Sequence, residues 1–174
     1  MRSDRKNDHP AGPDDGQGEE RNKIHAILAC EAIRFGYRLG YLANLFSGPI
    51  YKELSALHGI SRPEWVVLFC LAHFDGLTAH EVGRMTGRAK ANVSRAVHKL
   101  QQLDLLRREK NPADARSTIL HLTEKGKRMY ELTLPPFIER EAAMLSVLSP
   151  DDIQALDRLL ERLSIRDDGW DAAY

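Results

Sequence analysis

The sequence predicts a mainly α-helical protein that carries one small β-hairpin. Apolar residues recur every three or four positions along most of the 174 residues, which is the spacing of helices with one buried face. Residues 117–122 instead have strand composition, and the turn-forming residues 111–114 precede them. A length of 174 residues suits a compact domain with additional helices, and the sequence holds no apolar run of the length that a membrane span needs.

The start of the chain predicts a tail followed by a long helix. Residues 1–20 are rich in charged, Gly and Pro residues, lack the apolar core of a secretory signal and are expected to form a disordered tail. Residues 22–46 carry one apolar stripe at helical spacing. The Gly-Pro pair at positions 48–49 is expected to interrupt this helix, and a short helix is expected over residues 51–57.

Two capping sequences mark the starts of the next helices. Ser61 precedes Glu64 by three positions, and Thr78 precedes Glu81 in the same way. In each pair the hydroxyl can accept an amide N–H while the carboxylate reaches back to the start of the helix. The first capping sequence predicts the start of an almost wholly apolar core helix, and the second predicts the start of a short helix that ends near Gly87.

A further helix, over residues 89–103, follows after only a few residues. Its apolar residues fall on one side of the helix: Val93, Ala96, Val97, Leu100 and Leu103. Two short helices joined by a tight turn form a helix-turn-helix, whose second helix is free to enter a DNA groove. A hairpin built from residues 105–109 and 117–122 comes next, so the predicted architecture is a winged helix-turn-helix.

The last third of the chain predicts two more helical segments. A helix from Thr123 is expected to run to about residue 148, with a kink or break at positions 135–136, where two prolines lack amide donors. Ser149 caps a last helix with one apolar stripe, formed by Ile153, Leu156, Leu159, Leu160 and Leu163. This stripe needs a partner surface, and residues 166–174 are expected to be a tail.

Charge is distributed unevenly in a chain that is neutral overall. Residues 84–128 hold 12 Lys and Arg against 4 Asp and Glu, a net charge of +8, so the remainder carries −8. This separation of charge is expected if one surface of the protein binds phosphates while the rest of the surface is acidic and keeps the protein soluble. A merely uneven surface is the alternative.

The outward face of the helix over residues 89–103 carries the residues suited to read bases. With Val93 set at zero, the angles of Ala91, Ser94, Arg95 and His98 lie between about 100° and 200°. Arg can bond two acceptors on guanine, so Arg95 is the expected base reader. Lys90 and Asn92 flank this face, and Thr86, Arg88 and Lys99 are expected to contact the DNA backbone. The alternative is a solvated amphipathic helix.

The hairpin favours DNA binding over that alternative. Arg107 and Arg108 precede its loop, and the loop carries Lys110 and Arg116. A β-ribbon with these cations could reach an adjacent minor groove, whose negative potential attracts arginine. Asp114 is expected to bond the loop and orient Arg116.

These residues resemble the MarR (multiple antibiotic resistance regulator) family. The resemblance is dense over residues 61–127, and its most specific part is an Asp-x-Arg wing followed by Leu-Thr-x-x-Gly. It rests on the stretches 68–76, 78–82, 92–95, 100–107, 111–116 and 120–126. The chain departs from the family at Asp104, where a glycine usually ends the recognition helix, so a distorted turn is expected there.

The resemblance implies a homodimer that presents two recognition helices and two wings to a palindromic DNA site, most commonly as a repressor. Residues 21–60 and 128–165 would be dimerisation helices flanking a DNA-binding domain at residues 61–127. The apolar stripes of the terminal helices agree with this, because a two-fold dimer would cover them.

The resemblance also implies release from DNA by a small aromatic acid or phenol. An aromatic carboxylate needs a cation and flat apolar walls. Residues that could supply them, on two helices expected to face each other, are Arg38, Tyr41, Trp65, Phe69 and His73. For each aromatic the alternative is plain core packing, and for Arg38 it is a surface ion pair.

Other mechanisms are less well supported by the sequence. Cys30 and Cys70 lie in apolar helical patterns, which indicates inert buried thiols in a cytoplasmic protein rather than a redox sensor, although some MarR relatives sense oxidants. The histidines show no metal-ligand spacing, so no metal or other cofactor is expected. No nucleophile, phosphate loop or paired carboxylate indicates an enzyme. A winged helix that binds only protein would not need Arg95 and Arg116.

Overall fold

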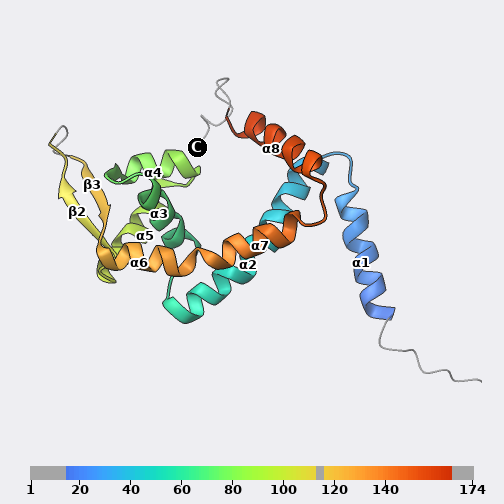
Figure 1. The fold of residues 1–174 in the computed structure, drawn as a ribbon, viewed down its shortest axis with the longest axis horizontal. Helices are drawn as coiled ribbons and strands as arrows, with labels where there is room; N and C mark the ends of the chain where they lie inside the picture. The colour runs from blue at the N-terminus through green and yellow to red at the C-terminus, as the bar shows by residue number, and fades with distance from the viewer. Residues whose placement is uncertain (1–14, 113–115, 166–174) are drawn as a thin grey trace, which may run out of the picture. The chain divides into compact units, whose positions relative to one another are not determined.

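The computed structural model describes residues 15–112 and 116–165 (Figure 1). Within these ranges the chain is mostly helical with one three-stranded antiparallel sheet, as the sequence predicts. The helices are α1 (Asp15–Leu28), α2 (Arg34–His58), α3 (Arg62–His73), α4 (Ala79–Thr86), α5 (Lys90–Gln102), α6 (Glu124–Thr133), α7 (Pro135–Leu145) and α8 (Pro150–Ser164). The strands are β1 (Leu77–Thr78), β2 (Leu106–Lys110) and β3 (Thr118–Leu122).

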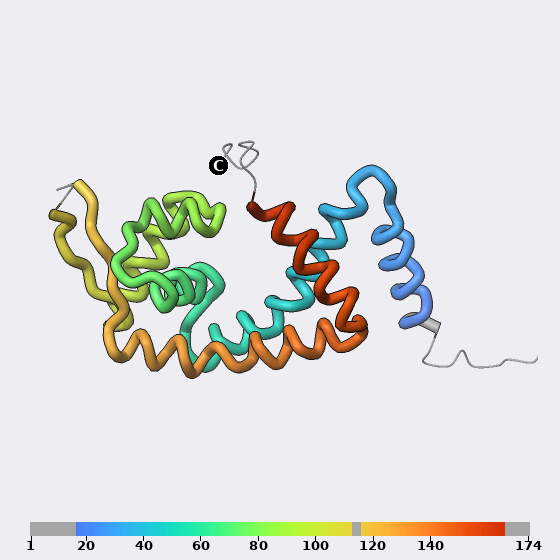
Figure 2. The backbone as a smooth tube through the Cα atoms, turned by 45° about the horizontal axis from the view of Figure 1, so that its top comes forward, coloured from blue at the N-terminus to red at the C-terminus, as the bar shows by residue number. Residues whose placement is uncertain are grey.

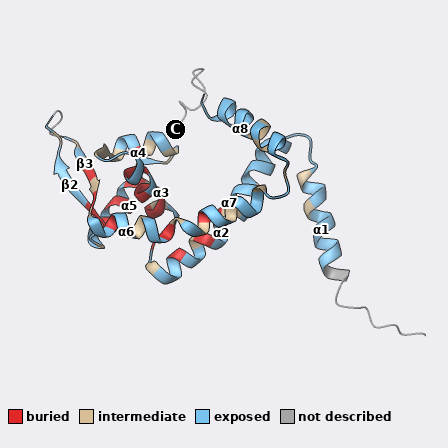
Figure 3. Ribbon diagram, in the orientation of Figure 1, coloured by how far each residue is buried: buried red, intermediate tan, exposed pale blue. Residues whose placement is uncertain are grey.

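The chain divides into two compact units, residues 1–45 and residues 46–174, and the boundary falls inside α2. The second unit holds the core, which gathers where α3 packs on α5, α6 and β3 (Figure 3). Side chains that are almost fully buried there include Leu68, Val82, Val93, Leu100 and Leu120. Burial of these faces is the main driving force for folding this unit.

The predicted hairpin forms the main part of the sheet. Strand β3 lies in the middle, and its partner β2 pairs in a register from Leu106 opposite Leu122 to Lys110 opposite Thr118. Strand β1 was not predicted from the sequence; its two residues pair with Leu120 and Ile119 of β3. A strand of two residues is too short to show an alternating pattern.

The capping predictions are confirmed. The carboxylate of Glu64 accepts from the Ser61 amide at 2.8 Å, and Glu81 accepts from the Thr78 amide at 2.7 Å. Gly87 ends α4 in the left-handed conformation, with φ of +60°. These local bonds satisfy amides that a helix start leaves open and so fix where α3 and α4 begin.

The N-terminal helices differ from the prediction in two places. Helix α1 begins at Asp15, inside the expected tail, and the predicted helix over residues 22–46 is broken at residues 29–33. No Gly or Pro occurs in residues 29–33, so no breaker signals the end of α1. The Arg38 guanidinium donates to the Leu28 carbonyl at 2.9 Å, which satisfies one of the carbonyls left open there.

The Gly-Pro pair was expected to end a helix, and this prediction is wrong. Helix α2 continues through Pro49 to His58. Pro49 has no amide to donate, but Arg140 of α7 donates to the neighbouring Phe46 carbonyl at 2.8 Å. The next residue, Ile50, is buried in the core, so tertiary packing outweighs the local preference.

The prolines at positions 135 and 136 do interrupt a helix as expected. Helix α6 ends at Thr133 and α7 begins at Pro135. Figure 2 shows that the chain (orange) nevertheless keeps nearly the same direction through this break. A bond from the Phe137 amide to the Leu134 carbonyl, 3.0 Å long, bridges the interruption.

The end of α5 and the start of α6 are held together by a set of backbone contacts that we call the α5–α6 junction, formed by residues 103–105 and 123–126. Leu105 donates to the Leu100 carbonyl at 2.9 Å, and its own carbonyl accepts from the Thr123 amide at 3.1 Å. Lys125 donates to the Leu103 carbonyl at 2.8 Å. A shift of α5 would therefore also move the start of α6.

Asp104, which stands where MarR proteins usually have glycine, adopts the left-handed conformation with φ of +58°. The expected distortion is not found, because the turn closes with the Leu105–Leu100 bond typical of a helix end. The hydroxyl of Thr123 donates to the Asp104 carbonyl at 2.8 Å and helps to hold this conformation. Asp is among the residues that tolerate the left-handed region.

Gly126→Ala is expected to destabilise the protein. A Cβ at this position would lie 2.0 Å from the Leu105 carbonyl oxygen, a backbone atom that cannot move without opening the α5–α6 junction. We expect a loss of about 2–3 kcal/mol in the free energy of unfolding, measured by urea denaturation. The control is Gly48→Ala, whose Cβ would meet nothing within 4 Å. It should be neutral or stabilise by up to about 1 kcal/mol, and equal effects of the two substitutions would contradict the account.

Candidate nucleic-acid interface

The helix-turn-helix is formed by α4, a tight turn and α5. The left-handed Gly87 lets the Arg88 amide donate back to the Gly83 carbonyl at 3.1 Å, and α5 begins at Lys90. The inner face of α5 is buried through Val93, Ala96, Val97 and Leu100. This packing decides which side of α5 remains outside.

The predicted outward face of α5 is exposed. It presents Lys90, Ala91, Ser94, Arg95 and His98, and Asn92 is half-buried beside them. The Arg95 guanidinium donates to the side-chain oxygen of Asn92, so the two form one unit. Because Arg loses much side-chain entropy when it is ordered, this contact holds the guanidinium ready for a ligand.

Gln102 extends the same face and was missed in the sequence analysis. Its amide nitrogen lies 3.1 Å from Nε2 of His98. The spacing of four residues on one helix was the available signal. The pair adds hydrogen-bonding groups at the C-terminal end of the exposed face.

Three residues expected to contact the DNA backbone also interact with the protein itself. The Thr86 hydroxyl donates to the Val82 carbonyl at 2.7 Å. Lys99 lies 3.4 Å from a carboxylate oxygen of the buried Glu64. Arg88 is half-buried, and its charge acts on the Cys70 thiol. They lie closer to the core side of the helices than Arg95 does.

The hairpin of β2 and β3, which we call the wing, carries the other cations. Arg107, Arg108 and Lys110 are exposed along β2, and Arg116 is exposed next to β3. The Asn111 side chain donates to the Ser117 hydroxyl at 2.7 Å and closes the base of the loop. The predicted loop residue Asp114 lies outside the described residues.

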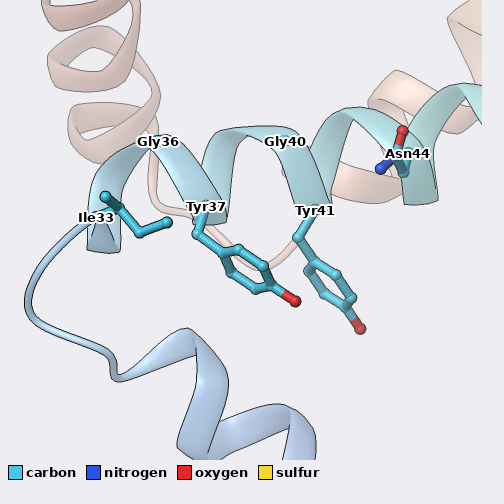
Figure 4. A pocket seen from close by; sticks show the side chains of 6 residues that line it. All are labelled: Ile33, Gly36, Tyr37, Gly40, Tyr41 and Asn44. Carbon is cyan, nitrogen blue, oxygen red and sulfur yellow. The ribbon is translucent and has the colours of Figure 1, made fainter.

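The predicted ligand residues lie in different units. Arg38 and Tyr41 belong to the first unit, where Arg38 is bonded to Leu28 and Tyr41 is half-buried. Tyr41 lines an open hollow of about 390 Å³ along α2 (Figure 4). The hollow exists because Gly36 and Gly40 leave the helix surface bare beside two tyrosines that point the same way; its lining is Ile33, Gly36, Tyr37, Gly40, Tyr41 and Asn44.

In the second unit, Trp65, Phe69 and His73 form an aromatic ladder along α3. The ring centroids of Trp65 and Phe69 lie 5.4 Å apart, and those of Phe69 and His73 lie 4.3 Å apart. Trp65 is buried, stacks on Phe137 at 3.9 Å and donates to the Thr133 hydroxyl at 3.1 Å, as a core residue does. Phe69 is 39% exposed and His73 is exposed, so the outer part of the ladder is accessible.

Tyr130 of α6 completes the outer part of the ladder and was not predicted. Its ring centroid lies 6.3 Å from that of Phe69 and 6.0 Å from that of His73. Burial raises the pKa of its hydroxyl, so it remains a neutral hydrogen-bond donor at neutral pH. Nothing in the sequence links a residue on α6 with α3, because the contact depends on how the helices pack.

The two cysteines differ in exposure. Cys70 is buried in α3, and burial raises the pKa of its thiol against the smaller opposite effect of the Arg88 charge. The prediction of a buried thiol is wrong for Cys30, which is exposed between α1 and α2 where the predicted helix breaks.

Among the described residues no cluster of three or more His, Cys, Asp or Glu side chains could hold a metal ion. None of the helices in those ranges is long and apolar enough to span a membrane.

The thiols are expected to react at very different rates. At pH 8 a thiol reagent should modify Cys30 quickly, whereas Cys70 should react only after denaturation because it is buried and its thiolate is disfavoured. Counting modified thiols by mass spectrometry before and after adding denaturant measures this. Cys30→Ser should abolish the fast reaction, and comparable rates at both sites would refute the assigned environments.

A helix-turn-helix followed by a hairpin wing defines the winged helix-turn-helix class of DNA-binding proteins. A family model described as "MarR family" matches residues 58–117. Over 108 residues the chain is 30% identical to the HTH-type transcriptional regulator MhqR of Bacillus subtilis, covering 62% of this chain and 74% of MhqR. The uncharacterized regulator YkoM of the same organism is 32% identical, with 62% and 70% covered.

Solved structures share the fold. The PcaV regulator of Streptomyces coelicolor in complex with its natural ligand superposes with a TM-score of 0.64 at 23% identity, covering 79% of this chain and 94% of PcaV. The MepR–DNA complex of S. aureus gives 0.66 at 21% identity, with 74% and 95% covered. The chain belongs to the MarR family, and it is therefore a DNA-binding transcription regulator and not an enzyme.

Proposed function

We propose that the protein is a homodimeric repressor that binds a palindromic operator with α5 in the major groove and the wing in the adjacent minor groove. The observation that carries this proposal is the exposed Arg95 face of α5, followed in the chain by an exposed, arginine-bearing wing. Phosphate contacts supply affinity, and a bidentate Arg contact to guanine supplies specificity. A relative, MepR, has been solved as a complex with DNA, which supports the same use of this fold.

Uncovered apolar faces support the homodimer. Helix α8 has no buried residue, although Leu163 and its neighbours form an apolar stripe. Phe35 is 72% exposed and Leu39 46% exposed on the first part of α2. Pairing with a second copy would remove these side chains from water, at a gain of about 25 cal/mol per Å² of apolar surface.

The regulator is proposed to release DNA when an aromatic carboxylate or phenol binds. Phe69 and His73 offer a flat apolar wall and a polar ring edge, and Tyr130 adds a neutral hydroxyl. Arg38 and Tyr41 remain proposed ligand residues of the first unit, where Tyr41 lines the hollow along α2. PcaV was solved with a natural ligand, so a relative of the same fold binds a small molecule. Such a regulator would control genes of aromatic-compound breakdown, efflux or stress.

Arg95→Ala and Arg116→Ala are each expected to weaken binding to the DNA upstream of the protein's own gene. Loss of a base-reading Arg costs about 1–3 kcal/mol and relaxes sequence preference, whereas loss of a wing Arg also reduces the salt dependence of binding. Fluorescence anisotropy at moderate salt measures both effects. The control Arg158→Ala removes an equal charge from α8 and should bind normally. Wild-type affinity of both test variants, with dimers intact, would refute the proposed interface.

At least one acid in a panel of aromatic carboxylates and phenols should release the protein from DNA in a gel-shift titration. Phe69→Ala should raise the concentration needed by about two- to tenfold, because a ring contact is lost, without changing DNA affinity. Phe74→Ala, which removes an exposed ring outside the ladder, is the matched control. Release by an oxidant but by no acid would overturn the effector proposal and favour redox sensing through the exposed Cys30.

A further inference from the structure

The wing places one histidine between two carboxylates. Nδ1 of His121, on β3, lies 3.0 Å from both carboxylate oxygens of Asp75, which is in the turn after α3. Nε2 of the same ring lies 3.5 Å from Oε2 of Glu109 on β2. The His121 side chain is only 15% exposed, so the ring is held between these partners.

The three residues span the whole sheet. Within the described residues, strand β2 pairs with β3 alone and lies at the edge of the sheet, and β1 pairs with the other side of β3. Asp75 comes two residues before β1, and a Cβ at Gly76 between them would be in ordinary van der Waals contact with the His121 ring, at 3.6 Å. A ring that binds both carboxylates therefore links β2 to the turn that leads from α3 into β1.

Only the charged form of the ring can bind both carboxylates. A neutral imidazole has one N–H and must present a lone pair to one of its two acidic neighbours, whereas the imidazolium donates from both nitrogens. Histidine is the side chain whose charge changes between about pH 5 and 8.

Two cations also face this group. Arg107 of β2 lies 2.9 Å from the Glu109 oxygen that faces His121, and Lys127 of α6 acts electrostatically on Asp75. Both cations keep their charge at all pH values of interest, so the protonation of His121 adds one positive charge to the wing. A positive charge next to bound phosphates strengthens binding to DNA.

We propose that His121 is a positioning residue which, when protonated, fastens the wing through Asp75 and Glu109 and makes DNA binding tighter at mildly acidic pH. This rests on the proposed function, because it matters only if the wing contacts DNA. No direct contact between His121 and DNA is required. His121 acts through the position and charge of the strand that carries Arg107, Arg108 and Lys110.

The test is the pH dependence of binding to a duplex from upstream of the protein's own gene, measured at constant ionic strength from pH 8 to pH 5.5. Wild-type affinity should rise by about two- to fivefold more than that of His121→Asn. Asp75→Asn and Glu109→Gln should each reduce this difference. His25→Asn, which removes an exposed histidine of α1, is the control and should keep the wild-type profile. An unchanged profile in His121→Asn overturns the inference.

Two further measurements distinguish failure of the proposed DNA interface from failure of the inference about His121. If Arg95→Ala and Arg116→Ala bind like the wild type, the proposed interface itself fails; if they weaken binding but His121→Asn keeps the pH profile, only this inference fails. Nitrogen-15 NMR of the His121 ring in the wild-type protein needs no variant to fold. Protonation of both nitrogens over the pH range in which affinity rises is expected, and a single neutral tautomer throughout would overturn the proposal.

Discussion

The α5–α6 junction is the constraint on which the arrangement of the second unit depends. Between Gln102 and Glu124 the chain ends α5, passes through both strands of the wing and starts α6. The carbonyl of Leu105 accepts the Thr123 amide, and only a glycine at position 126 lets α6 approach that carbonyl. The orientation of Arg95 on α5 and of Arg116 near the wing therefore derives from one set of backbone contacts, and neither can be set independently.

The basic residues separate into two groups. Arg95 and the cations of β2 are exposed, whereas Lys99 contacts the buried Glu64 and Arg88 is half-buried. The net charge of +8 over residues 84–128 is thus a mixture of exposed charge and charge used to hold the helices in place. The exposed charge is available for phosphates, and the buried Glu64 shows that part of the rest balances an internal acid.

The parts of the fold that depend on sequence neighbours could be predicted from the sequence, whereas those that depend on long-range packing could not. The caps at Ser61 and Thr78 and the turn at Gly87 involve neighbours in sequence, so the sequence alone predicts them correctly. Helix α2 continues through Pro49 where long-range packing holds it: Ile50 is buried, and Arg140, far along the chain, donates to the Phe46 carbonyl. The contacts of Tyr130 with the aromatic ladder and of His121 with Asp75 are likewise long-range, and no short motif encodes them.

The placement of α5 in the major groove and of the wing in the minor groove is tested most directly by methylation protection. Dimethyl sulfate modifies N7 of guanine in the major groove and N3 of adenine in the minor groove. The bound protein is expected to protect guanines in two major-groove segments about one helical turn apart, with protected adenines in the flanking minor grooves. Protection confined to one groove, or found at a single segment, would contradict this placement.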